Sequence, residues 1–285
     1  MSLPTPSHVA VIGGGRMGAG IAQVFATVGS SVTVAEAADR DAAAARVRIG
    51  LDRAAERDAL SGQPAAEVLS RVRFVGAPED IPSDADLVVE AVPEDPALKV
   101  EVLGIVGKTV SSSTIIASNT SSLSIGELGT ALEDPARFIG MHFFNPVPVS
   151  GLVEIVRAPA TSESTAAAVR SWVEGLGKTA VVVNDSPGFA TSRLGVCLGL
   201  EAIRMVEEGV ADAESIDRAM ELGYRHPMGP LRSTDLVGLD VRLAIAEHLA
   251  TTLGDRFAPP QLLRDKVARG ELGRKSGKGF YEWNR

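Results

Sequence analysis

The chain has 285 residues, 45% hydrophobic and 22% charged, so it can bury a sizeable core in one large domain or, as we expect, in two smaller ones. A net charge of −8 argues against bulk attraction to nucleic acid or anionic membranes, and no apolar run approaches the roughly 20 residues that span a bilayer. The single cysteine, Cys197, excludes an intrachain disulfide and favours a reducing, cytoplasmic location, and its apolar neighbours predict a buried thiol. The first eight residues predict a flexible polar arm without a signal peptide, and no metal site is predicted.

A glycine-rich turn joins a short apolar strand, residues 9–12, to a helical run, residues 19–28. Gly13, Gly15 and Gly18 permit the tight turn, the close approach of a pyrophosphate and close packing of the helix on the strand. A glycine pattern alone is weak evidence, but a strand before it and a helix after it are the required context. The stretch therefore predicts a dinucleotide-binding site.

The next predicted strand, residues 31–36, ends in Glu36, which is placed to accept hydrogen bonds from an adenosine ribose. A carboxylate there repels a 2′-phosphate, so the sequence favours NAD over NADP. Arg40, four residues on, could attract that phosphate and works against this preference.

A long helix is predicted over residues 39–61, and it carries several arginines. Arg53 and Arg57 are four residues apart and should share a face, with Arg46 on nearly the same stripe. This face is either solvated or a phosphate contact for a large anionic substrate.

Two predicted strands end in polar residues at the edge where open α/β sheets bind ligands. After residues 87–92, Asp95 should cap a helix that reaches residue 106, with Glu94 and Lys99 beside its start. After residues 114–118, the run 119–122 consists of small polar side chains that could cap the next helix or contact a ligand.

An apolar, strand-forming run contains His142, one of four histidines in the chain. Because side chains alternate along a strand, His142 and Phe144 should point to one face and Met141 and Phe143 to the other. A hairpin-like return after the prolines would bring the Glu154 carboxylate beside the imidazole. Such a pair is either a general acid/base or a core histidine neutralised by a structural carboxylate.

A domain boundary is predicted between residues 184 and 185, where Ser186 could cap a new helix. Residues 1–184 then form a Rossmann-type α/β sheet domain, and residues 185–285 an all-α domain. The aromatic residues near the C-terminus should pack back onto the fold. The helices expected in the second domain cover residues 189–208, 213–222, 238–253 and 260–268.

Several stretches together resemble the short-chain L-3-hydroxyacyl-CoA dehydrogenase family, which includes the bacterial 3-hydroxybutyryl-CoA dehydrogenases. They follow the family order from end to end of the chain. The matching stretches are GGGRMGAGIA at 13–22, VEAV at 89–92, ASNTSSL at 117–123, MHFFNPVP at 141–148, LVE at 152–154, SPGF at 186–189, HPMGP at 226–230, DLVGLD at 235–240 and GRKSGKGFY at 273–281.

This resemblance implies the reversible, NAD-dependent oxidation of a 3-hydroxyacyl-CoA to a 3-oxoacyl-CoA, in fatty-acid, butyrate-type or aromatic-acid catabolism, by a homodimer. It implies that His142 takes the hydroxyl proton, that Glu154 orients His142, and that Ser121 contacts the substrate oxygen near the nicotinamide. The residues that match family cofactor contacts are Glu94, Lys99, Asn145 and Lys275, and we expect Asn145 to face the substrate as well.

The chain departs from the family pattern at the second domain's active-site asparagine, which falls at Ser192. A hydroxyl group replaces an amide there, so we keep Ser192 as a weaker catalytic-site residue. The family's serine and lysine contacts to CoA fall at Asp52 and Ala59. We therefore expect Arg53 and Arg57 to replace them as substrate contacts.

Two alternatives remain at this level. The altered CoA positions are compatible with a dehydrogenase of a non-CoA hydroxy acid, as in related gulonate and carnitine dehydrogenases. An NAD-binding protein with little turnover, like the crystallin relatives, is the other alternative, and the presence of Ser121, His142 and Glu154 argues against it.

Overall fold

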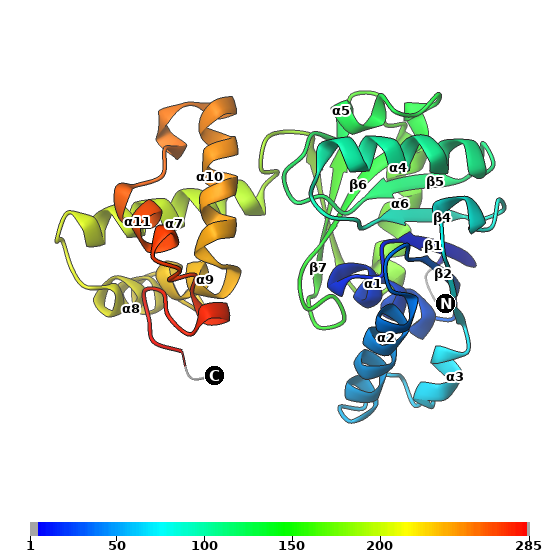
Figure 1. Cartoon of the computed structure of the whole chain (residues 1–285), viewed down its shortest axis with the longest axis horizontal. Helices are drawn as coiled ribbons and strands as arrows, with labels where there is room; N and C mark the ends of the chain where they lie inside the picture. Colours follow the sequence, from blue (N-terminus) through cyan, green and yellow to red (C-terminus); the bar gives the residue numbers. More distant parts are fainter. Residues whose placement is uncertain (1–4, 284–285) are drawn as a thin grey trace. The chain divides into compact units, whose positions relative to one another are not determined.

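The computed structural model describes residues 5–283. The chain divides into two compact units, Met1–Ser186 and Pro187–Arg285 (Figure 1). The first combines a sheet with helices, and the second is built from helices, as the predicted fold class requires.

Eight strands in the described part of the first unit form one sheet in the order β3-β2-β1-β4-β5-β6-β7-β8. The strands β1 to β6 run parallel, β7 pairs antiparallel with β6, and β8 pairs parallel with β7. The first six strands thus have the doubly wound order of a Rossmann fold, whose ligands bind at the carboxyl ends of the strands. The strands are β1 His8–Ile12, β2 Ser31–Ala35, β3 Val72–Val75, β4 Leu87–Glu90, β5 Ile115–Ser118, β6 Phe138–Phe143, β7 Leu152–Arg157 and β8 Thr179–Asn184.

Most helices of this unit begin at a polar side chain that accepts a hydrogen bond from the N–H group three residues on. Asp39, Asp95, Ser124 and Ser162 do so at α2, α4, α5 and α6. The cap that we predicted at Asp95 is therefore confirmed. The helices are α1 Arg16–Thr27, α2 Arg40–Ala55, α3 Ala65–Leu69, α4 Pro96–Thr109, α5 Ile125–Gly129 and α6 Glu163–Gly175, with 3-10 turns at Pro78–Asp80 and Pro135–Arg137.

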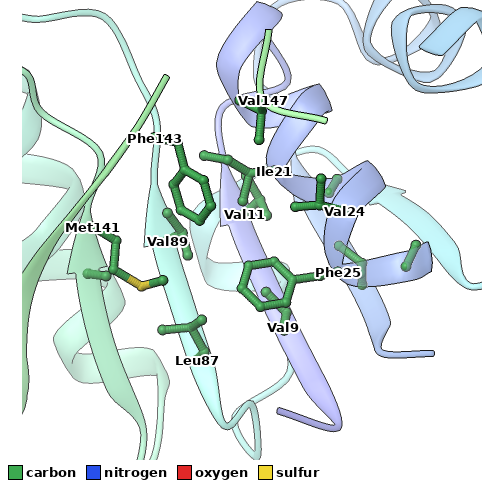
Figure 2. Close-up of a cluster of buried hydrophobic side chains, with 14 of the residues drawn as sticks. Val9, Val11, Ile21, Val24, Phe25, Leu87, Val89, Met141, Phe143 and Val147 are labelled. Atoms are coloured by element: carbon green, nitrogen blue, oxygen red, sulfur yellow. The ribbon is translucent and has the colours of Figure 1, made fainter. Parts of the chain in front are cut away.

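The main hydrophobic core lies on one face of the sheet, against α1, α2 and α6. Figure 2 shows Met141 and Phe143 of β6 on the same side as Val9 of β1 and Phe25 of α1. Burial of a large apolar side chain contributes about 1.5–3 kcal/mol, so these contacts strongly favour one orientation of β6. The intervening residue, His142, must then point to the opposite face.

Apolar residues from all five α-helices make up the core of the second unit, including Leu200, Ile216, Leu231, Leu249 and Leu263. The helices are α7 Thr191–Glu207, α8 Ala213–Gly223, α9 Pro230–Val237, α10 Leu239–Leu253 and α11 Gln261–Ala268, with 3-10 turns at Asp255–Phe257 and Arg274–Ser276.

The C-terminal aromatic segment packs back onto this unit, as predicted. The buried Asp235 carboxylate accepts hydrogen bonds from the N–H groups of Phe280 (2.9 Å) and Tyr281 (3.0 Å) and from Nε1 of Trp283 (2.8 Å). The Tyr281 hydroxyl donates to Asp217 at 2.8 Å. Burial, followed by this hydrogen bond and the Asp217 charge, raises the pKa of Tyr281 above its ordinary value.

Several helix boundaries differ from our predictions: α1 begins at Arg16 and not at residue 19, and α4 continues to Thr109 and not only to residue 106. At α2 and α7 the backbone shows the reason. α2 ends at Ala55 and not near residue 61, because Asp58 has a positive φ and the Ala59 N–H closes the end onto the Ala54 carbonyl. α7 begins at Thr191 and is not capped by Ser186, because Gly188 and Phe189 have positive φ and hold a turn before the helix.

The prediction of a buried Cys197 is wrong, since its side chain is exposed. Cys197 lies three residues after Leu194, which is 70% exposed, so the two share the outer face of α7. The predicted N-terminal arm is wrong for its last residues. Pro6 is buried and its carbonyl accepts the Ser30 hydroxyl at 2.6 Å, while residues 1–4 lie outside the described part.

Candidate active site

The glycine turn has the geometry of a phosphate-binding loop. Gly13 has φ of +102°, and a Cβ at Gly18 would collide with the Gly13 carbonyl oxygen, so both positions require glycine. At Gly15, the N-cap of α1, no side chain caps the helix, and a Cβ would meet no atom within 4 Å. The N-terminal N–H groups of α1 thus border open space, which fits the pyrophosphate of NAD.

Glu36 lies directly beside this turn. Its carboxylate accepts hydrogen bonds from the N–H groups of Gly14 (2.7 Å) and Ala38 (2.8 Å), and Arg46 donates to the Gly14 carbonyl at 3.1 Å. Burial raises the pKa of Glu36, but hydrogen bonds from Ala38, Gly14 and Asp39 together with the Arg46 charge outweigh it, and the pKa lies below its ordinary value. Glu36 therefore stays anionic and keeps lone pairs for a ribose diol.

His142 and Glu154 face each other on neighbouring strands, as the alternation pattern predicted. They are direct partners in the antiparallel pairing of β6 and β7, and His142 Nδ1 lies 2.8 Å from Glu154 Oε2. Glu154 is fully buried, His142 is 7% exposed, and the Phe144 ring lies 4.4 Å from the imidazole. With Nδ1–H donated to the carboxylate, a neutral imidazole carries its lone pair on Nε2, where it can accept a proton. The catalytic role of the pair stays a prediction.

Lys178 holds the loop between β6 and β7 in place. Its ammonium group donates to the carbonyls of Val147 (2.7 Å) and Ser150 (2.6 Å), and burial lowers the pKa of this lysine. Asn145 lies in this loop, two residues after the end of β6, and is exposed. It is therefore accessible to a ligand, and its predicted contacts stay predictions.

Ser121 lies in the loop after β5, and Glu94 organises this loop. Glu94 Oε1 accepts hydrogen bonds from the Thr120 hydroxyl (2.6 Å), the Ser121 N–H (2.8 Å) and the Ser121 hydroxyl (3.1 Å). Two residues before Ser121, Asn119 Oδ1 accepts the Phe143 N–H at 2.9 Å, which connects the loop to the strand that carries His142. The structure therefore brings Glu94 and Ser121 together.

The sequence analysis did not predict a buried ion pair between the last residue of β4 and the first turn of α4. Glu90 Oε1 lies 2.6 Å from Lys99 Nζ, and the side chains are 0% and 1% exposed. A glutamate at the end of an otherwise apolar strand was the available signal, because a buried carboxylate requires a partner. Lys99 was predicted as a cofactor contact, and the structure places its ammonium group 3.4 Å from the Glu94 carboxylate. The predicted contact stays a prediction.

Ser192 and Lys275 belong to the second unit. Ser192 is the second residue of α7, and the Lys275 ammonium lies 2.5 Å from the Asp240 carboxylate. Their predicted roles toward substrate and cofactor stay predictions.

The predicted arginine stripe runs past the end of the helix. Arg53 lies in the last turn of α2, and Arg57 lies in the turn that follows its end. Both side chains are exposed, whereas Arg46 is drawn to the glycine turn. A substrate contact by Arg53 or Arg57 would have to come from the helix end.

Residues 5–283 hold no group of three His, Cys, Asp or Glu side chains that could bind a metal ion. Over the same range, no helix is both long and apolar enough to cross a membrane.

Comparison with known families gives two matches that together span nearly the whole chain. The NAD binding domain of 3-hydroxyacyl-CoA dehydrogenase matches residues 8–186, and the C-terminal domain of the same family matches residues 188–283.

Individual relatives agree with these matches. A protein of Deinococcus radiodurans named probable 3-hydroxybutyryl-CoA dehydrogenase is 46% identical over 276 residues, which cover 96% of this chain and 99% of the relative. A 3-hydroxybutyryl-CoA dehydrogenase of Mycobacterium tuberculosis is 42% identical over 281 residues, covering 97% and 98%. The solved structure of (S)-3-hydroxybutyryl-CoA dehydrogenase from Ralstonia eutropha superposes with a TM-score of 0.93 at 41% identity, covering 99% of this chain and 100% of that one.

Proposed function

Since the chain belongs to the 3-hydroxyacyl-CoA dehydrogenase family, we propose that it catalyses the reversible, NAD-dependent oxidation of a short-chain 3-hydroxyacyl-CoA, such as 3-hydroxybutyryl-CoA, to the 3-oxoacyl-CoA. The observation that carries the proposal is the buried His142–Glu154 pair at the carboxyl end of the sheet. It supplies a proton acceptor in a Rossmann-type fold whose glycine turn fits NAD.

In the oxidative direction, His142 Nε2 accepts the proton of the 3-hydroxyl group while the C–O bond becomes a carbonyl. NAD, which the glycine turn and Glu36 would hold, would supply the acceptor for the hydride from C3 when bound. Glu154 holds the Nδ1–H tautomer and stabilises the positive charge that develops on the ring. In the reductive direction, the same imidazolium returns the proton to the forming alkoxide.

The remaining site residues have supporting roles in this proposal. Ser121 hydrogen-bonds at the substrate oxygen once its hydroxyl turns from Glu94, while its N–H keeps the loop on the Glu94 carboxylate. Asn145, exposed in the loop after β6, contacts the cofactor and the substrate. Glu36 binds the adenosine ribose.

The alternative of a non-CoA hydroxy acid has no specific support in the site. The relatives named above act, by their names, on a CoA thioester. We also propose a cytoplasmic homodimer, in which exposed apolar side chains of the second unit such as Leu194, Leu222 and Tyr224 supply buried area. Light scattering at assay concentration tests the dimer.

The decisive assay follows NADH absorbance with a panel of 3-oxoacyl-CoA substrates of increasing length and with free 3-oxobutyrate. Highest kcat/KM with the four-carbon thioester supports the proposal, and His142→Ala should lower kcat about 10²–10⁴-fold because a positioned acid/base contributes that much. The NADH Kd should stay unchanged, since cofactor binding is assigned to the glycine turn and Glu36. Faster turnover of the free acid, or near-normal turnover by His142→Ala, would contradict it.

A further inference from the structure

Lys178 is a buried lysine at the edge of the sheet where ligands bind. It lies in the turn between α6 and β8, and its N–H group donates to the Val173 carbonyl at the end of α6 at 3.2 Å. The first residue of β8 pairs with the first residue of β7, and β7 runs antiparallel to β6. The amino end of β8 therefore lies at the same edge as the carboxyl end of β6, which carries His142.

The Lys178 ammonium group holds the loop that joins β6 to β7. It donates to the carbonyls of Val147 (2.7 Å) and Ser150 (2.6 Å), and the residue is 8% exposed. Burial of an ammonium group is unfavourable unless hydrogen bonds replace those to water, and an apolar side chain would fill the same space without that cost. A lysine in this place therefore indicates that the position of the loop matters.

The loop lies directly on helix α1. Pro146 and Pro148 lack N–H groups and cannot donate to a neighbouring strand. Val147, between them, is 2% exposed, and a Cβ at Gly20 of α1 would lie 2.8 Å from its Cβ. Figure 2 shows Val147 beside α1. Lys178 thus binds the carbonyl of the residue that packs the loop on α1, the helix whose N-terminus borders the open space at the glycine turn.

Asn145 depends on this arrangement for its position. It lies two residues before Val147 and is exposed, and its predicted partners are the cofactor and the substrate. A shift of the loop away from α1 would move Asn145 relative to both the glycine turn and His142. The backbone that carries Asn145 is held against such a shift by the two hydrogen bonds from Lys178.

We propose that Lys178 is a positioning residue: its hydrogen bonds to the Val147 and Ser150 carbonyls fix the loop on α1 and so place Asn145 for the cofactor and the substrate. Lys178 acts through Asn145 and touches neither ligand. The part that concerns the substrate rests on the proposed function.

The test is a double-mutant cycle between Lys178→Met and Asn145→Ala, with Lys108→Met as a control for an exposed lysine. Methionine keeps most of the lysine stem and removes the donors. NADH Kd is measured by fluorescence, kcat and KM with a short 3-oxoacyl-CoA, and stability by thermal unfolding. We expect Lys178→Met to lower kcat/KM about 10- to 100-fold and to raise the NADH Kd, because misplacement of an orienting group by about 1 Å has effects of this size. Lys108→Met should match the wild type.

The coupling between the two positions separates positioning from other roles. If Lys178 acts through Asn145, Lys178→Met should change kcat/KM and NADH Kd by less than about twofold once Asn145 is already alanine, since only independent effects add. A purely structural lysine, or one that contacts a ligand itself, would cause the same fold-change in the Asn145→Ala background as in the wild type. That result would overturn the proposal, and so would wild-type kcat/KM and NADH Kd in either single variant.

Lys178→Gln replaces Lys178→Met in the cycle if the methionine variant fails to fold. Its amide is an uncharged donor, so it retains part of the hydrogen bonding to the loop. We expect a smaller loss of kcat/KM that again disappears in the Asn145→Ala background, and an equal loss in both backgrounds would overturn the proposal. If the wild type reduces no 3-oxoacyl-CoA, the proposed function fails, while the cycle measured by NADH Kd still decides the inference.

Discussion

Replacing Glu154 by glutamine isolates the charge of the catalytic pair from its shape. The carboxylate is fully buried in β7 and lies 2.8 Å from His142 Nδ1, so the amide fits the same space with little rearrangement. Two properties change: the negative charge disappears, and the amide NH₂ can donate to Nδ1. A ring that accepts at Nδ1 carries its proton on Nε2, which is then unable to take the hydroxyl proton.

The expected loss follows from the charge that develops on His142 during oxidation. Two unit charges about 4 Å apart interact by about 4 kcal/mol at an effective dielectric constant of about 20. An amide dipole replaces part of this, so we expect a loss of about 3 kcal/mol, which corresponds to about a 10²-fold decrease in kcat. The wrong tautomer would add to it.

The assay is the rate of NADH formation from a 3-hydroxyacyl-CoA at saturating NAD, with NADH Kd measured separately. Glu163→Gln is the matched control, because Glu163 is an exposed carboxylate paired with Arg157 of the same strand β7. We expect the control to retain wild-type kcat and both variants to bind NADH normally. A kcat for Glu154→Gln within about threefold of wild type would refute the reasoning and leave Glu154 a structural partner of a buried histidine.

Three further outcomes are expected. The wild type should have a kcat/KM for NAD more than about tenfold that for NADP, because a 2′-phosphate beside anionic Glu36 costs a few kcal/mol. Glu36→Ala should reduce this ratio of kcat/KM values. Comparable kcat/KM with both cofactors in the wild type would contradict the prediction. The double variant Arg53→Ala/Arg57→Ala should raise the KM for the acyl-CoA severalfold with little change in kcat, and an unchanged KM would make these side chains merely solvated. Lys99→Met should raise the Glu94 pKa, because the Lys99 charge lowers it. The acid limb of the pH profile of kcat/KM should then move to higher pH. An unmoved limb would contradict the coupling between the Lys99 charge and Glu94.

Features governed by local chemistry could be predicted from the sequence. Asp95 and Pro96 mark the start of α4 because a capping carboxylate and a proline are both favoured there. His142 and Glu154 could be paired because alternation along β6 and β7 fixes the face of each side chain and the prolines between the strands require a return.

Features governed by tertiary contacts could not be predicted in the same way. The Glu90–Lys99 pair joins a strand to a helix, and their separation of nine residues carries no periodic signal. The end of α2 was missed because the arginine-rich run continues past Ala55, while the helix is stopped by the backbone conformation at Asp58. Exposure of Cys197 was missed because apolar neighbours in sequence lie on different faces of α7.

The antiparallel pairing of β7 is what makes the proposed proton relay possible. Parallel neighbours require a long crossover, whereas β6 and β7 are joined by a short loop that lets residues twelve apart in sequence face each other directly. Because side chains alternate, a slip of one residue would turn Glu154 toward the core face occupied by Met141 and Phe143 and leave His142 opposite an apolar side chain. The apolar packing of those two residues against β1 and α1 therefore does more than stabilise the fold. Together with the buried Val153 and Ile155 of β7, it sets the register that places a carboxylate against the imidazole.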